Sequence, residues 1–156
     1  MGSRIKIGVL SDTHGLLRPE ALEAMRGSRL ILHAGDVGSP AVLEGLGAIA
    51  PVRAVRGNVD RGEWAEGLPL TDAVDVAGLL VYLIHDVGDL DLDPAAAGVG
   101  VIVSGHSHRP SAEVSRGVLY LNPGSAGPRR FSLPVSAAVL TVEGGRVSHR
   151  LVVLKE

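Results

Sequence analysis

The stretch V-I-V-S-G-H-S-H, at residues 101–108, is the part of the sequence from which the fold and chemistry are most readily predicted. Its β-branched, apolar start predicts a buried strand, and Gly105 then turns the backbone before two histidines. Residues i and i+2 of extended backbone point to the same side, so His106 and His108 are expected to aim their imidazoles into one pocket. Taken alone, the motif is explained more simply by two hydrogen-bonded surface histidines. Whether it indicates a functional site therefore depends on the rest of the chain.

The first part of the chain alternates between strand and helix patterns. Strands are expected at residues 5–10, 29–32 and 52–55, because these runs are mostly apolar, as strands covered on both faces are. Helices are expected from Pro19 to Met25 and from Pro40, where Ser39 serves as the N-cap, to just before Pro51. This alternation predicts βαβ crossovers and a parallel sheet.

From Thr71 onward, strand follows strand. One brief helix, capped by Asp93, is expected to reach Ala97. With 156 residues and no linker, the chain is predicted to form a single domain spanning residues 1–156. The strands of this part are expected at residues 72–76, 79–84, 99–104, 118–121, 135–142 and 147–154, and Val114 is expected to pair with residues 118–121 in a hairpin around the Arg116-Gly117 turn.

Residues able to bind metal follow several of these strands. In open α/β sheets ligands bind at the carboxyl ends of the strands, so these residues are expected to share one edge. Each has an ordinary alternative, such as an Asx turn at Asp12 or a satisfied edge histidine at His85. Four of only six histidines at one edge nevertheless favour a site. The set is Asp12, His14, Asp36, Asn58, His85, His106 and His108.

Imidazole, carboxylate and amide groups together suit divalent transition metals, and seven donors exceed the needs of one ion. Two ions are therefore expected, with Mn2+ favoured by availability and Ni2+, Fe2+, Co2+ and Zn2+ as alternatives. A pair of ions roughly 3.5–4 Å apart serves in-line attack on phosphorus, so phosphoryl transfer is the leading chemistry. The absence of cysteine excludes thiolate nucleophiles, disulfides and cysteine-type zinc sites.

With these residues identified, the chain resembles the calcineurin-like metallophosphoesterases, and among them the small YfcE-type bacterial and archaeal phosphodiesterases. The resemblance implies an α/β fold of two packed mixed β-sheets flanked by helices, an αββα sandwich. It rests on D-T-H at 12–14, G-D at 35–36, G-N-V-D at 57–60, His85, G-H-S-H at 105–108 and N-P-G-S at 122–125.

The resemblance also implies how the ligands divide between two metal ions. Asp36 would bridge the ions, and a metal-bridging hydroxide would hydrolyse a phosphodiester, with Asp36, Asn58 and His106 as catalytic residues. One ion would take Asp12, His14, Asp36 and His108. The other would take Asp36, Asn58, His85 and His106.

Several further residues carry predictions of their own. Larger relatives have a histidine after the asparagine of the G-N block, where it assists the leaving group, but this chain has Val59. His33 is expected to pack or hydrogen-bond at a strand end, and His149 to face solvent. Arg56 is a candidate phosphate contact because a guanidinium matches phosphate oxygens. Asn122, Gly124 and Ser125 are further candidates, although a turn into the last hairpin explains that loop equally well.

The composition of the chain limits the classes of partner that it can bind. The net charge of −2 and the aromatic content of 3% argue against a nucleic-acid surface, because neither a basic cluster nor stacking platforms are present. No apolar run approaches the ~18 residues of a membrane helix, and no signal peptide is evident. The expected partner is a small phosphoester in the cytoplasm, and a homo-oligomer is left open.

Two other functions fit the same residues. The retromer scaffold subunit resembles this group in fold, so a non-catalytic interaction module is one alternative. Another dinuclear metal hydrolase, such as an amidase, is the second. The filled ligand positions favour an enzyme over the module, and the order of the motifs favours a phosphoesterase over an amidase.

Overall fold

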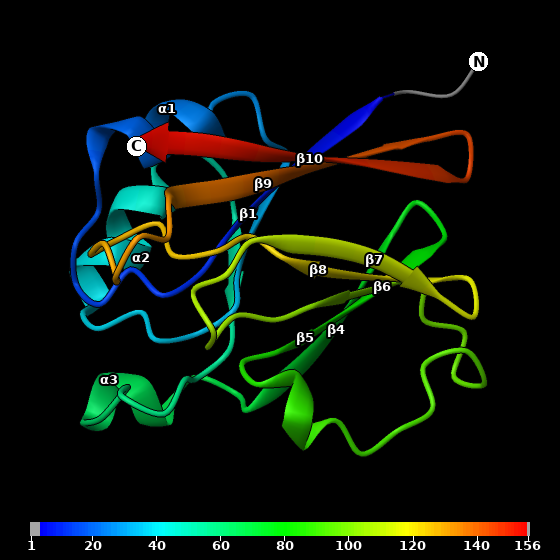
Figure 1. The fold of residues 1–156 in the computed structure, drawn as a ribbon, viewed down its shortest axis with the longest axis horizontal. Coiled ribbons are helices and arrows are strands. Elements are labelled where there is room, and N and C mark those ends of the chain that lie inside the picture. The colour runs from blue at the N-terminus through cyan, green and yellow to red at the C-terminus, as the bar shows by residue number, and fades with distance from the viewer. Residues whose placement is uncertain (1–3, 156) are drawn as a thin grey trace.

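Two five-stranded sheets stack on one another in the computed structural model, which describes residues 4–155 (Figure 1). Residues 1–3, to which the sequence assigns no role, and residue 156 lie outside the described residues. Apolar side chains from both sheets, including Ile7, Val9, Leu83 and Val103, form the core between them. The predicted arrangement of two packed mixed sheets is therefore confirmed.

The first sheet has the order β10-β9-β1-β2-β3. Strands β1, β2 and β3 are parallel, as the alternating first part of the sequence predicted, whereas β9 runs antiparallel to β1 and β10 antiparallel to β9. The strands are β1 (Ile5–Leu10), β2 (Leu30–His33), β3 (Val52–Ala54), β9 (Val135–Glu143) and β10 (Arg146–Lys155).

The second sheet has the order β4-β5-β6-β8-β7. Its central strands β5, β6 and β8 are parallel, and antiparallel hairpin partners lie at both edges. The strands are β4 (Thr71–Val76), β5 (Leu79–Ile84), β6 (Val101–Val103), β7 (Ser111–Ser115) and β8 (Val118–Asn122).

Helices α1 (Pro19–Met25) and α2 (Pro40–Gly47) cover the outer face of the first sheet. Met25 and Leu46 are fully buried there in a cluster with Ile31 of β2. The Oγ of Ser39 accepts a hydrogen bond from the N–H of Ala41 at 3.2 Å, which confirms the predicted N-cap. The short helix α3 (Glu63–Glu66), which the sequence analysis missed, contributes Trp64 to the same cluster.

The outer face of the second sheet is covered differently. A 3-10 turn, η1 (Val87–Asp89), and a single turn at residues 94–98 lie in the segment between β5 and β6. The helix predicted from Asp93 to Ala97 is wrong, because Gly98 adopts a φ of 76° and the N–H of Val99 closes the turn on the carbonyl of Pro94 at 2.9 Å. Among residues 4–155, no helix is long and apolar enough to cross a membrane.

Candidate metal centre

The predicted metal ligands gather where the carboxyl ends of both sheets meet. Asp12 and His14 follow β1, Asp36 follows β2 and Asn58 follows β3, while His85 and the histidine pair of residues 106 and 108 follow β5 and β6. Two contacts join the sheets at this edge. His85 Nδ1 lies 2.7 Å from the carbonyl of Ala34, and the N–H of His106 donates to Asp12 Oδ2 at 3.1 Å.

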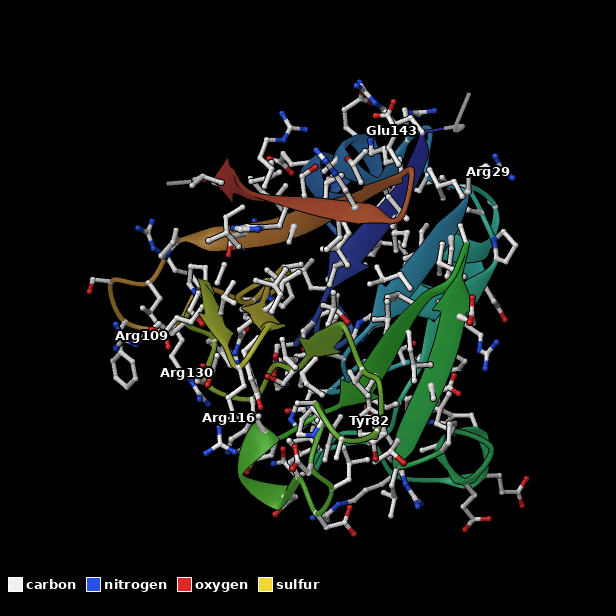
Figure 2. All side chains as sticks on the ribbon, turned by 90° about the vertical axis from the view of Figure 1, so that its right-hand side faces the viewer. Arg29, Tyr82, Arg109, Arg116, Arg130 and Glu143 are labelled. Carbon is white, nitrogen blue, oxygen red and sulfur yellow. The ribbon has the colours of Figure 1, made fainter. Side chains whose placement is uncertain are left out.

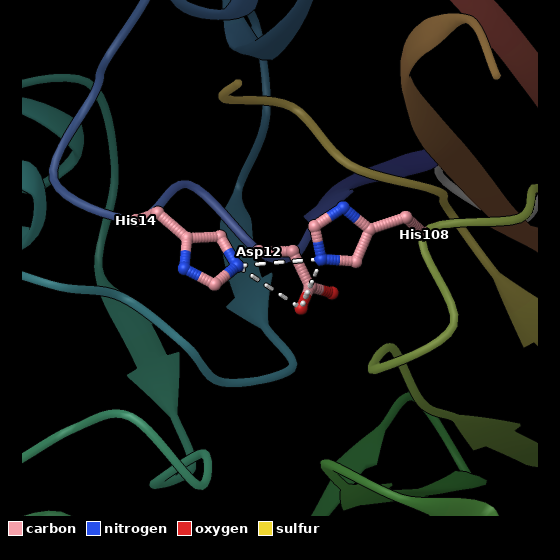
Figure 3. A group of neighbouring side chains, drawn as sticks. All are labelled: Asp12, His14 and His108. Atoms are coloured by element: carbon pink, nitrogen blue, oxygen red, sulfur yellow. Dashed lines mark hydrogen bonds and ion pairs between the residues drawn. The ribbon is translucent and has the colours of Figure 1, made fainter. Parts of the chain in front are cut away.

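Asp12, His14 and His108 form the first half of the centre (Figure 3). Both imidazoles turn a nitrogen toward one carboxylate oxygen, with His108 Nε2 3.3 Å and His14 Nε2 3.7 Å from Asp12 Oδ1. The two Nε2 atoms lie 3.3 Å apart. One carboxylate oxygen and two imidazole nitrogens thus converge from two different sheets.

The hydrogen bonding of Asp12 shows that this half fits a cation. Asp12 is fully buried, and its Oδ2 accepts hydrogen bonds from the hydroxyl of Ser11 at 2.6 Å and from the N–H of His106. Its Oδ1 is buried without a hydrogen-bond partner. Buried polar atoms are normally satisfied, so an acceptor without a donor, facing two imidazoles, matches a metal ligand. His108 Nδ1 is also buried and unpartnered, so no hydrogen bond fixes the tautomer of that ring.

Asp36, His85 and Asn58 form the second half. His85 Nε2 lies 3.2 Å from Asp36 Oδ2 and 3.0 Å from Asn58 Oδ1. Because His85 Nδ1 donates to the carbonyl of Ala34, its Nε2 is the atom directed at these oxygens, the arrangement that carbonyl-oriented metal ligands show. Asp36 Oδ2 also lies 3.7 Å from His14 Nε2. Asp36 therefore faces histidines of both halves, as a bridging ligand must.

The side chain of His106 lies farther from the other predicted ligands and is more exposed than those of the other predicted histidines. Its side chain is 48% exposed, and its Nε2 lies 3.7 Å from Asp86 Oδ2. Its ring meets that of His85 edge-on, with centroids 5.3 Å apart. The structure thus places His106 beside the second half, while the two compact groups of potential ligand atoms are Asp12 with His14 and His108, and Asp12 with Asp36 and His85.

Burial and charge shift the protonation of these groups in opposite directions. Burial raises the pKa of Asp12, although the Ser11 hydrogen bond opposes the rise. Burial acts to raise the pKa of Asp36 as well, but hydrogen bonds from His85 and from the Val59 N–H outweigh it and lower the pKa to about 2. Burial also opposes charge on His85, yet its bonds to Asp36 and Ala34 raise its pKa. A proton on His85 Nε2 thus occupies the position that a cation would take.

Backbone strain is concentrated at the same residues. Five of the eight non-glycine residues with positive φ in the described chain are candidate ligands, and the other three lie in loops or turns. Such conformations cost about 1–3 kcal/mol each and cluster at functional sites, because there the surrounding structure must enforce them. The five are Asp12 (φ 55°), His14 (48°), Asp36 (54°), His106 (71°) and His108 (63°).

Two glycines and one aspartate that were not predicted as ligands hold the ligand loops together. A Cβ on Gly57 would collide with Asp36, and a Cβ on Gly105 would collide with Ser11 and Asp12. The backbone at each glycine therefore packs directly against a neighbouring ligand residue. Asp60 is buried and accepts from the N–H groups of residues 37, 38 and 57, at 3.2, 2.8 and 2.9 Å. The signal for Asp60 was present in the G-N-V-D block, where a carboxylate follows a glycine by three residues.

His33 lies behind the centre and is confirmed as a packed, hydrogen-bonded residue. It is fully buried, its Nδ1 accepts from the Gly35 N–H at 3.1 Å, and its Nε2 lies 3.0 Å from Thr13 Oγ1. The Thr13 hydroxyl donates to the carbonyl of Val37 at 2.8 Å, so Nε2 carries the proton. Burial lowers the pKa of His33 to about 3. His149 is exposed, as predicted.

The predicted substrate contacts divide into two kinds. Arg56 lines a pocket of about 500 Å3 together with Asn58, His85 and His106. The polar groups of the 122–125 loop are instead engaged within the protein. Asn122 Nδ2 donates to the carbonyl of Gly105 at 3.0 Å, its Oδ1 accepts from the Gly124 N–H at 2.9 Å, and the Ser125 hydroxyl bonds the carbonyl of Asp12 at 3.0 Å. This loop supports the ligand loops and offers these groups less readily to an anion.

Residues 5–145 match the family model of the calcineurin-like phosphoesterase superfamily domain. A probable metallophosphoesterase from Methanothermobacter thermautotrophicus is 37% identical, in a match covering 94% of this chain and 91% of that protein. The structure of an archaeal phosphodiesterase superposes with a TM-score of 0.78 at 23% identity, covering 95% of this chain and 100% of that one. The structure of Vps29 from Entamoeba histolytica with Zn2+ superposes with a TM-score of 0.70 at 21% identity, covering 97% of this chain and 100% of that one.

Proposed function

The chain belongs to the calcineurin-like phosphoesterase superfamily, and we propose that it is a phosphodiesterase that works with two divalent cations. The observation that carries the proposal is the position of Asp36, whose Oδ2 lies 3.2 Å from His85 Nε2 and 3.7 Å from His14 Nε2. A carboxylate between two groups of imidazoles is the bridge that a dinuclear site requires.

The residues present fit two such cations. Asp12, His14 and His108 would hold one, and Asn58, His85 and His106 the other, with Asp36 shared. When bound, such cations activate water as the nucleophile and offset the charge that builds on phosphoryl oxygens. Mn2+ is the ion we expect, because nitrogen and oxygen donors accept it and it is available to cells, although the same donors also suit Zn2+, Ni2+, Co2+ and Fe2+.

The chain's own side chains would position the substrate. Arg56 takes part in none of the ion pairs within 4 Å in the described part of the chain, and it lines the same pocket as Asn58 and His85. A free guanidinium beside the ligands is suited to a phosphoryl oxygen. Val59 is 43% exposed and has no proton to give to a leaving group. The site therefore favours esters whose leaving groups depart as stable anions.

A non-catalytic interaction module is the second candidate, because the sorting protein Vps29 shares the fold. The two functions differ in what the metal ligands are for. All seven ligand positions keep metal-binding side chains, and Asp12 Oδ1 is buried without a partner. These features favour catalysis, since a docking surface alone does not require them.

The test is hydrolysis of bis(p-nitrophenyl) phosphate by the purified protein. Chelation should abolish turnover, and added Mn2+ should restore it. Metal binding should also raise the melting temperature, because a ligand that binds only the folded state stabilises it. Undiminished turnover after complete removal of metal would overturn the metal-dependent mechanism. Tight metal binding with no turnover of any phosphoester would favour the interaction module.

A further inference from the structure

The pocket beside the second half of the centre differs in charge from the other side of the site. It holds about 500 Å3 and opens directly onto His85, Asn58 and His106. A phosphodiester whose phosphorus lay at the metal centre would extend one of its two ester groups into this space. The side chains that line the pocket therefore determine which ester group it can bind.

Three carboxylates and one guanidinium line the pocket. Arg56 lies two residues from Asn58, next to the metal ligands, where it can pair with the phosphate. Asp86, Asp89 and Asp91 come from the loop after β5, and for Asp89 and Asp91 the described residues provide no basic partner within 4.0 Å. With Arg56 engaged by phosphate, the rest of the pocket is negatively charged.

The remaining lining is apolar and aromatic. Tyr82 and Ile84 lie on the outer face of β5, because Val81 and Leu83 point into the core between the sheets. Leu70, directly before β4, is 63% exposed and adds further apolar surface. An aromatic ring, apolar side chains and carboxylates together form the environment that binds organic ammonium groups.

The opposite side of the site has the reverse charge. Arg109 directly follows His108 in the chain, and Arg130 lies in the loop that precedes β9. Figure 2 shows Arg109 and Arg130 together on one side of the molecule, with Tyr82 apart from them. An ester group carrying extra negative charge would therefore be drawn to the arginines and repelled from the pocket of Tyr82.

We infer that the pocket beside His85 receives an ester group bearing a positive charge, so that the substrate is a phosphodiester of an amino or quaternary ammonium alcohol. The inference rests on the proposed phosphodiesterase function, whose substrate class it narrows. Asp89 and Asp91 are then specificity-determining residues that act through charge. Tyr82 would contact the ammonium group.

The experiment compares two probes of equal size. Methyl phosphocholine carries a quaternary ammonium, and methyl 3,3-dimethylbutyl phosphate replaces its nitrogen with carbon. Calorimetry on the metal-loaded protein should show about three- to tenfold tighter binding of the cation. The double variant Asp89→Asn/Asp91→Asn should bring the ratio of the two dissociation constants toward one. The control Glu20→Gln/Glu44→Gln, which removes two exposed carboxylates on helices of the other sheet, should leave the ratio unchanged.

Equal binding of the two probes by the parent protein would overturn the inference, as would a preference that the Asp89→Asn/Asp91→Asn variant retains in full. Turnover of bis(p-nitrophenyl) phosphate is measured on the same preparations. If that diester is hydrolysed while the probes bind equally, the charge preference alone is wrong. If no phosphoester is hydrolysed, the proposed function is wrong, while the calorimetric ratio still decides whether the pocket binds ammonium groups.

Discussion

In one half of the candidate centre the side chains of Asp12 and His108 are 0% and 5% exposed, whereas the other half combines His85, which is 7% exposed, with His106, which is 48% exposed. The buried half is anchored by Ser11 and by the His106 N–H, which both donate to Asp12. The exposed half opens onto the pocket. We propose that the first half retains an ion and the second meets the substrate, with Asp36 shared by both halves.

The largest effect is expected from the residue that the two halves share. Asp36→Asn keeps the size of the side chain and its acceptor for the Val59 N–H, but removes the charge. Loss of residues that merely orient metal ligands costs about 10- to 100-fold, so loss of a bridging charge should cost at least about 100-fold in kcat/KM. At least one equivalent of metal should also be lost. Elemental analysis and turnover check both; two retained equivalents with full turnover would disprove the bridge.

The two halves can be separated by a matched pair of histidine variants. His108→Ala removes a buried ligand, and we expect the protein to lose one equivalent of metal on dialysis. His106→Ala removes an exposed one, and we expect the equivalent in the buried half to remain while more added metal is needed for full rate. Metal titrations of activity provide the measurement. Identical behaviour of the two variants would contradict the division into a retaining and an exchanging half.

The exposed half should also show a steep dependence on the leaving group. Aryl diesters should be cleaved far faster than alkyl diesters of similar size, because Val59 cannot donate a proton. General acid catalysis contributes about 10²- to 10⁴-fold, so Val59→His should raise the rate for alkyl esters by up to about 100-fold. A series of diesters with graded leaving-group pKa tests this. A flat dependence in the parent would reveal another acid, and His33 is excluded from that role by full burial and a pKa of about 3.

The smallest expected effect is the pH dependence of stability that comes from His33, which lies behind the buried half. Because the pKa of His33 falls from an ordinary 6.5 to about 3 in the folded protein, its contribution to stability is complete above pH 6.5 and is lost as the pH falls toward 3. The slope from this one proton is at most about 1.4 kcal/mol per pH unit. Unfolding of metal-free protein should show a shallower pH dependence in His33→Gln, and no change in the exposed control His149→Gln. An unaltered slope in His33→Gln would refute the assignment.

Sequence patterns located β1, α1, α2 and the hairpins well, because their apolar periodicity and capping residues act locally. Ser39-Pro40 specifies a helix start through atoms within three residues of one another. The turn at residues 94–98 was misjudged because Gly98 ends it after one turn, and a glycine's φ is not encoded by apolar pattern. Helix α3 was missed because four residues carry too little periodicity to detect.

The candidate site could be predicted where metal-binding residues directly follow a strand. The contacts that support these residues could not, because they join segments far apart in the sequence. Asp12 and His85 could be named from their places in the chain. The support that Asp60 gives to two loops, and the engagement of Asn122 with Gly105, depend on backbone groups brought together only by folding. The charge of the pocket beside Tyr82 could not be predicted either, because the residues that line the pocket come from four separate segments and meet only in the folded protein.

The central claim is that one centre holds two ions between two sheets. Anomalous scattering from crystals of the metal-loaded protein, with elemental analysis and turnover measured on the same sample, tests it most directly. We predict two ions, one beside Asp12, His14 and His108 and the other beside Asn58, His85 and His106, with Asp36 contacting both and activity rising as the second ion binds. Full activity with a single ion, or an ion bound away from these residues, would contradict the account.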